Sequence, residues 1–270
     1  MSESAPSPPE PSRRLRPALA ALAVAVPLVP IVVALVLSGG RGGSNVQTAN
    51  GATVFAPVAA PKASPPSLAV PSGPGTLVAV VQRGTQMRSR PSGHAYAKLS
   101  VRTEFGSPEA LWVVRVSGRW LGVLSPLAGN GRVGWIPAAT ASLSRVSWKL
   151  EVSLAARRLT VLHAGHPVAH FTVAIGAPSA PTPTGRFAVT DRLRTGNPAG
   201  PYGCCILALS ATAPHAIQGW SGGNRIAIHS TPDTSSIGHP VSHGCLRLTL
   251  AQGRWLLAHV PLGTPTLISS

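Results

Sequence analysis

An uncharged stretch over 17–40 dominates the N-terminal part of this chain, and its residues 18–37 are almost all apolar. Twenty residues at about 1.5 Å each match the roughly 30 Å hydrocarbon core of a bilayer. The sequence therefore predicts a transmembrane helix over 17–38. Three arginines lie in the preceding tail, 1–16, and only one follows soon after the stretch. By the positive-inside rule this tail is cytoplasmic and the rest of the chain lies outside the membrane.

A cleaved signal peptide is the alternative interpretation of 17–38. The apolar region of a signal peptide is normally about 7–15 residues long and ends in a small-x-small cleavage site. The stretch here is longer and no convincing site follows it, which favours an uncleaved anchor. Both interpretations export the rest of the chain.

The segment 39–75 is rich in proline, alanine and serine and has no apolar period. This composition predicts an extended linker, with about 3.1 Å per residue where it is polyproline-like. The whole chain carries a formal net charge of +16 with only seven acidic residues, which suggests an anionic setting such as headgroups or an acidic polymer. The basic residues are scattered and no nucleic-acid motif occurs, so we expect no nucleic-acid partner.

Residues 76–143 are predicted to form a small β domain. Two β-rich stretches, 111–116 and 119–124, flank a Ser-Gly pair that is a hairpin signal. The strand that carries Trp120 and the Gly-Trp-Ile-Pro ending that carries Trp135 resemble a bacterial Src-homology-3-like barrel. We expect both tryptophans in the barrel core; a groove for a peptide or glycan is the alternative.

Residues 147–269 are predicted to be mainly β, with one or two short helices. Apolar and polar residues alternate over 148–153, as in a half-buried strand. Ala164-Gly165 is a plausible hairpin turn, and 251–259 is the one helical stretch. Further strands are expected at 159–162, 170–175, 186–190, 205–210 and 225–229.

Ser242-His243-Gly244-Cys245, with His229 sixteen positions before the cysteine, carries the groups of a nucleophilic site. Cysteine attacks as the thiolate, and a nearby imidazolium is expected to lower the pKa of Cys245 below about 8.5. An imidazole can also take the thiol proton. Gly244 lets the backbone pass close to the sulfur, so that N–H groups can face a developing oxyanion.

Several segments occur in the order found in the YkuD-type L,D-transpeptidase catalytic domain. Residues 226–230 (Ile-Ala-Ile-His-Ser) and 242–247 (Ser-His-Gly-Cys-Leu-Arg) resemble the family signature, in which a histidine precedes Ser/Thr-His-Gly-Cys. Residues 181–187 (Pro-Thr-Pro-Thr-Gly-Arg-Phe) and 235–238 (Ser-Ser-Ile-Gly) are similar to two further family segments. The resemblance covers 147–269 and implies a β-sandwich catalytic domain. The anchor, linker and small β-barrel ahead of it resemble the layout of actinobacterial members.

The resemblance implies an enzyme of cell-wall biosynthesis, and hence of cell shape, that needs no cofactor and no metal. Its partners would be peptidoglycan stem peptides. The cysteine attacks the third-residue carbonyl of a donor tetrapeptide and expels the terminal D-alanine. The third-residue amine of an acceptor then attacks the thioester. The enzyme would act outside the membrane, and carbapenems would acylate its cysteine.

Carried over residue by residue, the resemblance makes Cys245 the nucleophile and His229 the base. The backbone carbonyl of Ser230 would orient His229. Ser230 departs from the glycine that often follows this histidine, but a carbonyl serves the role whatever the side chain. The N–H groups of His243, Gly244 and Cys245 would form the oxyanion hole. Substrate contacts are expected from Ser242, Arg247 and Tyr202.

Three other functions are considered beside the transpeptidase. The same cysteine could serve an L,D-carboxypeptidase with water as acceptor, which the sequence does not separate from a transpeptidase. A non-catalytic wall-binding anchor gives no reason to keep both His229 and Cys245. A zinc site would use His239, His243 and Cys245, with His229 or Asp233, but a second cysteine pair and a nearby glutamate base are missing.

Cys204 and Cys205 are adjacent, and exported thiols tend to pair. A bond from either of them to Cys245 would block the nucleophile, so we do not expect one. We predict that both are small apolar core residues on a strand. Redox modulation through these two cysteines is the alternative.

Overall fold

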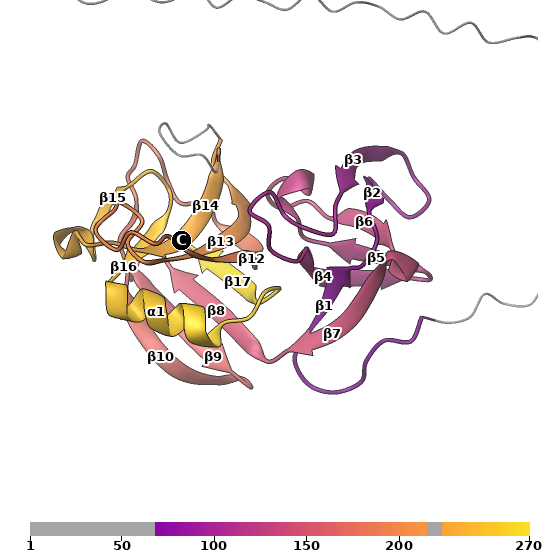
Figure 1. Cartoon of the computed structure of the whole chain (residues 1–270), viewed down its shortest axis with the longest axis horizontal. Coiled ribbons are helices and arrows are strands. Elements are labelled where there is room, and N and C mark those ends of the chain that lie inside the picture. The colour runs from indigo at the N-terminus through magenta and orange to yellow at the C-terminus, as the bar shows by residue number, and fades with distance from the viewer. Residues whose placement is uncertain (1–67, 215–222) are drawn as a thin grey trace, which may run out of the picture. The chain divides into compact units, whose positions relative to one another are not determined.

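The computed structural model describes residues 68–214 and 223–270 (Figure 1). The predicted cytoplasmic tail 1–16, the transmembrane helix 17–38 and most of the linker 39–75 lie outside the described residues. Within the described ranges, no helix combines the length and apolar character needed to cross a membrane.

Seven antiparallel strands form the first sheet, in the spatial order β3-β2-β6-β5-β4-β1-β7. The hairpin of β4 and β5 confirms the strands predicted around Ser117-Gly118. Two short 3₁₀ helices, η1 (Pro126–Ala128) and η2 (Ala138–Thr140), lie in its connections. The strands are β1 (Thr76–Val81), β2 (Thr85–Arg88), β3 (Ala95–Leu99), β4 (Ala110–Ser117), β5 (Trp120–Val123), β6 (Gly134–Pro137) and β7 (Ala141–Val146).

The two tryptophans expected in the core of this sheet lie on its other face. Trp120 and Trp135 are half-buried, whereas the neighbouring Leu121 and Ile136 are fully buried. Leu121 pairs with Ile136 across β5 and β6, and successive side chains of a strand point to opposite faces. The core prediction is therefore wrong, because alternation does not say which of the two faces is covered. The guanidinium of Arg88 lies 5.8 Å from the Trp120 ring centroid.

Eight strands form the second sheet, in the spatial order β10-β9-β8-β17-β12-β13-β14-β16 (Figure 1). Helix α1 (Leu250–His259) packs against β13 and β14, and a parallel pair, β11 (Ile175–Gly176) and β15 (Pro240–Ser242), lies near the end of the sheet that carries β16. A 3₁₀ helix, η3 (Thr234–Ser236), precedes β15. The strands are β8 (Trp148–Ser153), β9 (Arg158–His163), β10 (His166–Thr172), β12 (Gly185–Arg194), β13 (Cys205–Thr212), β14 (Arg225–Ser230), β16 (Leu246–Leu248) and β17 (Pro265–Ser269). The described part of the chain is therefore mainly β, as predicted.

Local sequence signals account for several of these elements. Ala164 and Gly165 both have positive φ, at 50° and 84°, which suits the tight hairpin that joins β9 to β10. Helix α1 begins with a capping box, in which the Thr249 hydroxyl accepts from the Gln252 N–H and the Gln252 side chain accepts from the Thr249 N–H.

The strand predicted over 170–175 ends earlier, at Thr172. Val173 and Ala174 are fully buried, and Ala174 exchanges two backbone hydrogen bonds with Arg247, at 2.9 and 3.1 Å. This bridge fixes the backbone of the segment that follows the Ser-His-Gly-Cys sequence.

Candidate active site

The parallel pairing of β14 with β16 determines where Cys245 lies. Ile228 pairs with Leu246 and His229 with Arg247, so Cys245, just before β16, lies beside Ala227. The Ala227 N–H donates a hydrogen bond to Cys245 Sγ at 3.4 Å. Ala227 and His229 are two residues apart on β14, so their side chains share one face. The fold thus brings the predicted thiol and the predicted imidazole to the same side of one strand.

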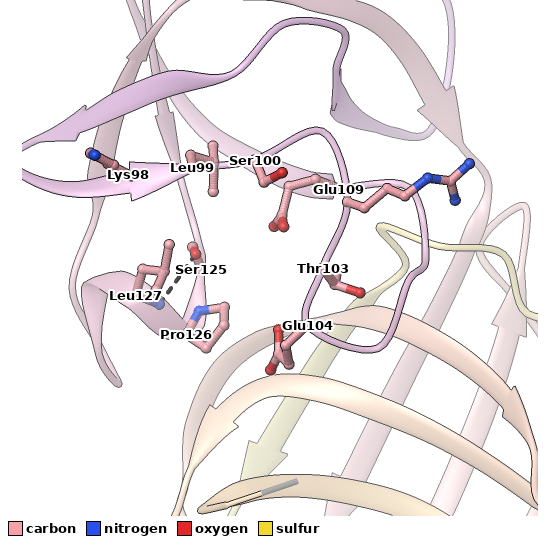
Figure 2. A pocket seen from close by; sticks show the side chains of 10 residues that line it. Lys98, Leu99, Ser100, Thr103, Glu104, Glu109, Ser125, Pro126 and Leu127 are labelled. Atoms are coloured by element: carbon pink, nitrogen blue, oxygen red, sulfur yellow. Dashed lines mark hydrogen bonds between the residues drawn. The ribbon is translucent and has the colours of Figure 1, made fainter. Parts of the chain in front are cut away.

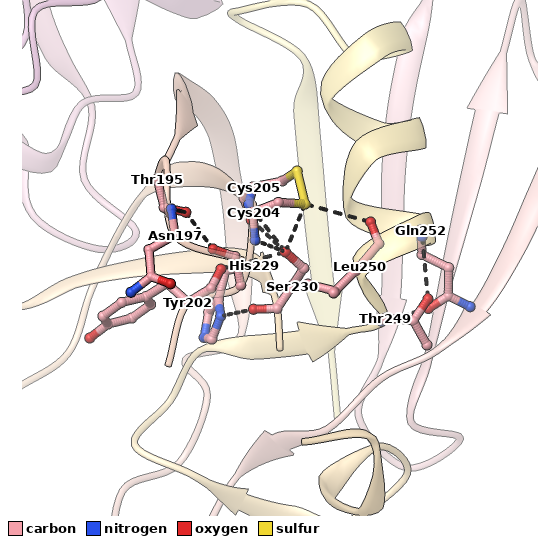
Figure 3. Close-up of a disulfide and its surroundings, with 11 residues drawn as sticks. Thr195, Asn197, Tyr202, Cys204, Cys205, His229, Ser230, Thr249, Leu250 and Gln252 are labelled. Carbon is pink, nitrogen blue, oxygen red and sulfur yellow. Dashed lines mark hydrogen bonds between the residues drawn. A yellow bond between two sulfur atoms is a disulfide. The ribbon is translucent and has the colours of Figure 1, made fainter. Parts of the chain in front are cut away.

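His229 is buried, with 3% of its surface exposed, and its Nδ1 lies 2.8 Å from the Ser230 carbonyl oxygen (Figure 3). A carbonyl only accepts hydrogen bonds, so Nδ1 carries the proton and Nε2 keeps a lone pair. Burial lowers the pKa of His229 to about 4; the Ser230 hydrogen bond opposes this shift and the positive charge of Arg247 adds to it. His229 is therefore neutral near pH 7 and able to accept a proton.

Cys245 is a free, buried cysteine, which agrees with the expectation that it forms no disulfide. Burial raises the pKa of the Cys245 thiol to about 11, although the Ala227 hydrogen bond and the Arg247 charge both lower it. The expectation of a lowered thiol pKa is wrong, because the buried imidazole is uncharged and cannot supply the cation that would stabilise a thiolate. The resting pair is thiol and neutral imidazole.

Ser242 and Gly244 shape the loop before the cysteine. The buried Ser242 hydroxyl donates to the Cys245 carbonyl at 2.6 Å and accepts from the Gly244 N–H at 3.1 Å. The Gly244 N–H, one of the three expected in an oxyanion hole, is therefore engaged inside the loop. Gly244 has φ of 109°, and a Cβ there would lie 2.8 Å from Ile226 Cδ1. Glycine is required at this position on both counts.

Thr182 holds the same loop and was not singled out from the sequence. Its hydroxyl donates to the Gly244 carbonyl at 2.9 Å and accepts from the Gly176 N–H at 2.9 Å. The Thr-Pro-Thr-Gly segment that contains it was noted as similar to a family segment. No local pattern indicates which of its two threonines contacts the loop before Cys245.

Tyr202 and Arg247 lie near the pair, and His243 is exposed. The Tyr202 ring packs edge-on against the His229 ring, with 4.9 Å between centroids. Arg247 is half-buried, and its Nε has no hydrogen-bond partner among the described residues. Burial raises the pKa of Tyr202, and the positive charge of Arg247 opposes this shift. The same charge acts on His229 and Cys245.

The Ser230 side chain points away from the site and organises the segment that carries Tyr202. Its Oγ accepts from the N–H groups of Cys204 and Cys205, at 3.0 and 3.1 Å (Figure 3). A Cβ on Gly203 would lie 2.5 Å from this Oγ, and one on Gly253 would lie 2.8 Å from Ser230 Cβ. The two glycines therefore make room for the Ser230 side chain.

Cys204 and Cys205 form a disulfide with each other (Figure 3). The prediction that they are unpaired apolar core residues is therefore wrong, because their sulfurs are bonded to each other. Cys205 does pack in the core. In an oxidising compartment thiols tend to pair, and for Cys204 the nearest thiol along the chain is that of Cys205.

The family model and the curated relatives that match this chain describe one kind of domain. Residues 147–268 match the family model of the L,D-transpeptidase catalytic domain. The "Putative L,D-transpeptidase YkuD" of Bacillus subtilis (strain 168) is 32% identical over 124 residues, which are 46% of this chain and 67% of that protein. An L,D-transpeptidase from Mycobacterium smegmatis is 21% identical with a TM-score of 0.37, covering 59% of this chain and 82% of that one. L,D-transpeptidase 3 from Mycobacterium tuberculosis, solved with a faropenem-derived adduct, is 21% identical with a TM-score of 0.37, covering 51% and 73%.

Proposed function

The chain belongs to the YkuD-type L,D-transpeptidase family, and we propose that it cross-links peptidoglycan through an acyl-enzyme on Cys245. The cross-link joins the third residues of two stem peptides. The observation that carries the proposal is the neutral, singly oriented imidazole of His229 on the strand face beside the Cys245 thiol. A thiol and a positioned base are what a covalent acyl transfer requires.

In the first half-reaction Cys245 Sγ attacks the third-residue carbonyl of the donor tetrapeptide, and the thiol proton passes to His229 Nε2. The backbone N–H groups of His243 and Cys245 face the oxyanion that develops. The intermediate collapses with cleavage of the bond to the fourth residue. The imidazolium returns its proton to the departing D-alanine amine, which leaves a thioester on Cys245.

In the second half-reaction an acceptor amine attacks the thioester and passes a proton to His229 Nε2. The Cys245 thiolate departs and regains that proton from the imidazolium. The new amide is the cross-link, and the enzyme returns to its resting thiol–imidazole state. Each proton is taken and returned by one nitrogen, because the Ser230 carbonyl keeps Nδ1 protonated throughout.

Arg247 and Tyr202 contact the donor in this proposal. Arg247 pairs with His229 across β14 and β16 and is half-buried, so its positive charge lies near the site and can attract a stem carboxylate. Tyr202 covers one side of His229 and borders the donor. Ser242 acts by holding the loop, because both of its hydroxyl contacts are internal.

The enzyme works outside the cytoplasmic membrane in this proposal, with 17–38 as its anchor, 39–75 as its tether and 147–269 as its catalytic domain. The disulfide between Cys204 and Cys205 is consistent with an oxidising compartment. The β domain over 76–143 is of the Src-homology-3-like type in this proposal.

Incubation of the full chain with a disaccharide-tetrapeptide, followed by mass spectrometry, tests the activity. A cross-linked dimer that has lost one D-alanine supports the transpeptidase. Tripeptide without dimer indicates the carboxypeptidase, and no product from a folded protein indicates a wall-binding role. Cys245→Ala should give neither dimer nor tripeptide.

A further inference from the structure

A cavity of about 300 Å³ opens among the loops of the first sheet (Figure 2). Leu99, Pro126 and Leu127 give it an apolar wall, and the hydroxyls of Ser100 and Ser125 lie on its edge. The carboxyl groups of Glu104 and Glu109 also line it. The cavity thus combines an apolar wall with two acidic and two basic residues.

Glu109 is the unusual member of this lining. Only 7% of its surface is exposed, and no hydrogen bond to its carboxyl group is found among the described residues. Its carboxyl group points into the cavity in Figure 2. A largely buried carboxyl is stabilised by a hydrogen-bond donor or a cation, so the cavity suits a ligand that supplies one.

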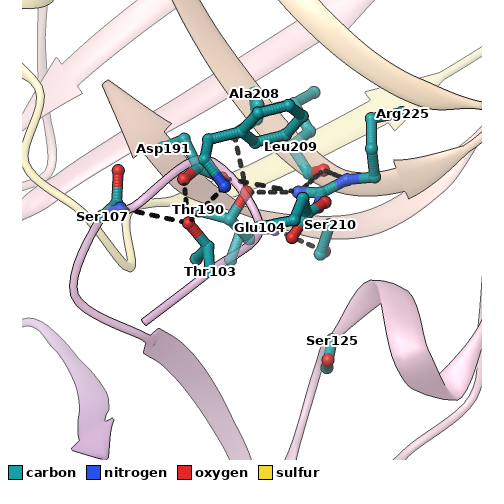
Figure 4. A network of polar contacts seen from close by, with 12 residues as sticks. Thr103, Glu104, Ser107, Ser125, Thr190, Asp191, Ala208, Leu209, Ser210 and Arg225 are labelled. Carbon is teal, nitrogen blue, oxygen red and sulfur yellow. Dashed lines mark hydrogen bonds and ion pairs between the residues drawn. The ribbon is translucent and has the colours of Figure 1, made fainter. Parts of the chain in front are cut away.

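Acidic residues gather near Glu109, although the chain as a whole is strongly basic. Glu104, Glu109 and Asp191 are three of the seven acidic residues of the chain. Arg225 forms ion pairs with Glu104 and Asp191 (Figure 4), and its charge also acts on Glu109. Asp191 is completely buried, and its Oδ2 has no hydrogen-bond partner in the described part of the chain. Nearly half of the acidic residues of a basic chain therefore lie near one another.

Arg225 is already engaged by other groups and does not reach Glu109 with a hydrogen bond. Its guanidinium donates to Glu104, to Thr190 and to the Leu209 carbonyl. The other basic side chains of the lining are Lys98 and Arg102. The Lys98 ammonium points away from Glu109 in Figure 2, and Arg102 donates to the Gly106 carbonyl at 2.7 Å.

We propose that this cavity binds the primary ammonium group of an alkylamine, with the head between Glu109 and Glu104. Such a head offers three N–H donors, which can reach the Glu109 carboxyl, for which no donor is found among the described residues, and the Glu104 carboxyl, which is already paired with Arg225. The alkyl stem lies along Leu99, Pro126 and Leu127. A bare metal ion fits less well, because it has no apolar part to cover the wall of Leu99, Pro126 and Leu127.

The proposed amine site is separate from the Cys245 site but is connected to it by one strand. Arg225 begins β14 and His229 lies four residues further on, about 13 Å along the strand. The inference goes beyond the proposed function and does not depend on it, since binding is measured without turnover.

Calorimetric titration of the detergent-solubilised full chain with n-butylammonium chloride at pH 8 tests the proposal. We expect saturable one-to-one binding with a Kd on the order of 1 mM. n-Butanol, which has the same stem without the charge, should bind at least tenfold more weakly. Glu109→Gln should weaken butylammonium binding at least tenfold and Glu104→Gln about threefold.

Glu151→Gln is the matched control, because Glu151 is half-exposed on β8 and pairs with Lys149 instead. Its binding should equal that of the wild type. Thermal unfolding of each variant establishes that it is folded before its binding is compared.

Lowering the pH from 8 to 5.5 should weaken binding at least tenfold, because burial and the charges of Asp191 and Glu104, opposed by Arg225, raise the pKa of Glu109 to about 7. Lys98 and Arg102 also line the cavity. The proposal is overturned if the wild type shows no saturable binding up to about 50 mM. It is equally overturned if folded Glu109→Gln binds as the wild type does, or if butanol binds as well as butylammonium.

Discussion

The Nδ1 of His229 donates a hydrogen bond to the carbonyl oxygen of Ser230, the next residue in the chain, at 2.8 Å. In a Ser-His-Asp triad a carboxylate holds the histidine in this way. A carbonyl fixes the same tautomer without adding a negative charge. The imidazole therefore stays neutral and buried, and the geometry depends on the backbone of β14 and not on an acidic side chain.

Removal of the Ser230 hydroxyl should lower the stability of the fold but leave the rate of Cys245 acylation nearly unchanged. Ser230→Ala keeps the carbonyl, so the rate of Cys245 acylation should stay within about threefold of the wild type. The N–H groups of Cys204 and Cys205 lose their acceptor, which should lower the free energy of unfolding by about 2 kcal/mol in urea titrations.

Ser235→Ala is the control for this experiment, because Ser235 is exposed. It should change the free energy of unfolding by no more than about 0.5 kcal/mol. A hundredfold loss of acylation rate in folded Ser230→Ala would contradict the role given to the carbonyl.

The acylation rate should depend on pH through a neutral base. Burial lowers the pKa of His229 to about 4, so the base loses its function only as the pH falls through about 4. Stopped-flow acylation by a carbapenem between pH 3.5 and 8 measures this fall in rate at low pH. A midpoint near 6.5 would mean that His229 is solvated in the working enzyme.

The pH dependence of Cys245 alkylation reports the pKa of its thiol. Burial raises its pKa to about 11, so the rate of iodoacetamide labelling should keep rising to pH 10 without a plateau. A plateau near pH 7 would instead indicate a preformed thiolate–imidazolium pair. Mass spectrometry of samples quenched at intervals gives the rate.

The number of free thiols tests the cysteine pairing. Unfolded, non-reduced protein should take up one alkyl group, on Cys245, because Cys204 and Cys205 are joined. After reduction it should take up three. Non-reduced Cys245→Ala should take up none, and labelling of that variant would contradict the disulfide.

Glu109 should make the fold less stable at high pH. Its pKa is raised to about 7 in the folded state, above the unfolded value of about 4.3, so the folded chain holds the proton more tightly. The associated stability is complete below about pH 4 and is lost as the pH rises through 7. Glu109→Gln avoids this loss.

The gain in stability of Glu109→Gln over the wild type should therefore grow between pH 4 and pH 8, to roughly 3 kcal/mol. Urea titrations at both ends of this range measure it, with Glu151→Gln as the control that should show no growth. A gain that does not change with pH would mean that Glu109 ionises normally.

The sequence predicted those elements that depend on local signals. The Ala164-Gly165 turn, the alternation over 148–153 and the helix that follows Thr249 are each determined within a few residues. The segments that hold Cys245 and His229 were also found, because their residue types and spacing are distinctive.

Features that depend on distant contacts could not be predicted. Which face of β5 is buried depends on the whole sheet, so Trp120 was assigned to the wrong side. The raised pKa of Cys245 depends on how deeply the completed fold buries it. Glu109, Asp191 and Arg225 lie close enough for their charges to interact, although dozens of residues separate them in the sequence. No local pattern links them.

Peptide mapping of the full chain after incubation with imipenem decides whether Cys245 is the nucleophile. We expect the mass of one opened carbapenem on the peptide that contains Cys245, and none on Cys204 or Cys205. His229→Gln should slow formation of this adduct at least a hundredfold. An adduct at any other residue, or an unchanged adduct in Cys245→Ala, would contradict the mechanism.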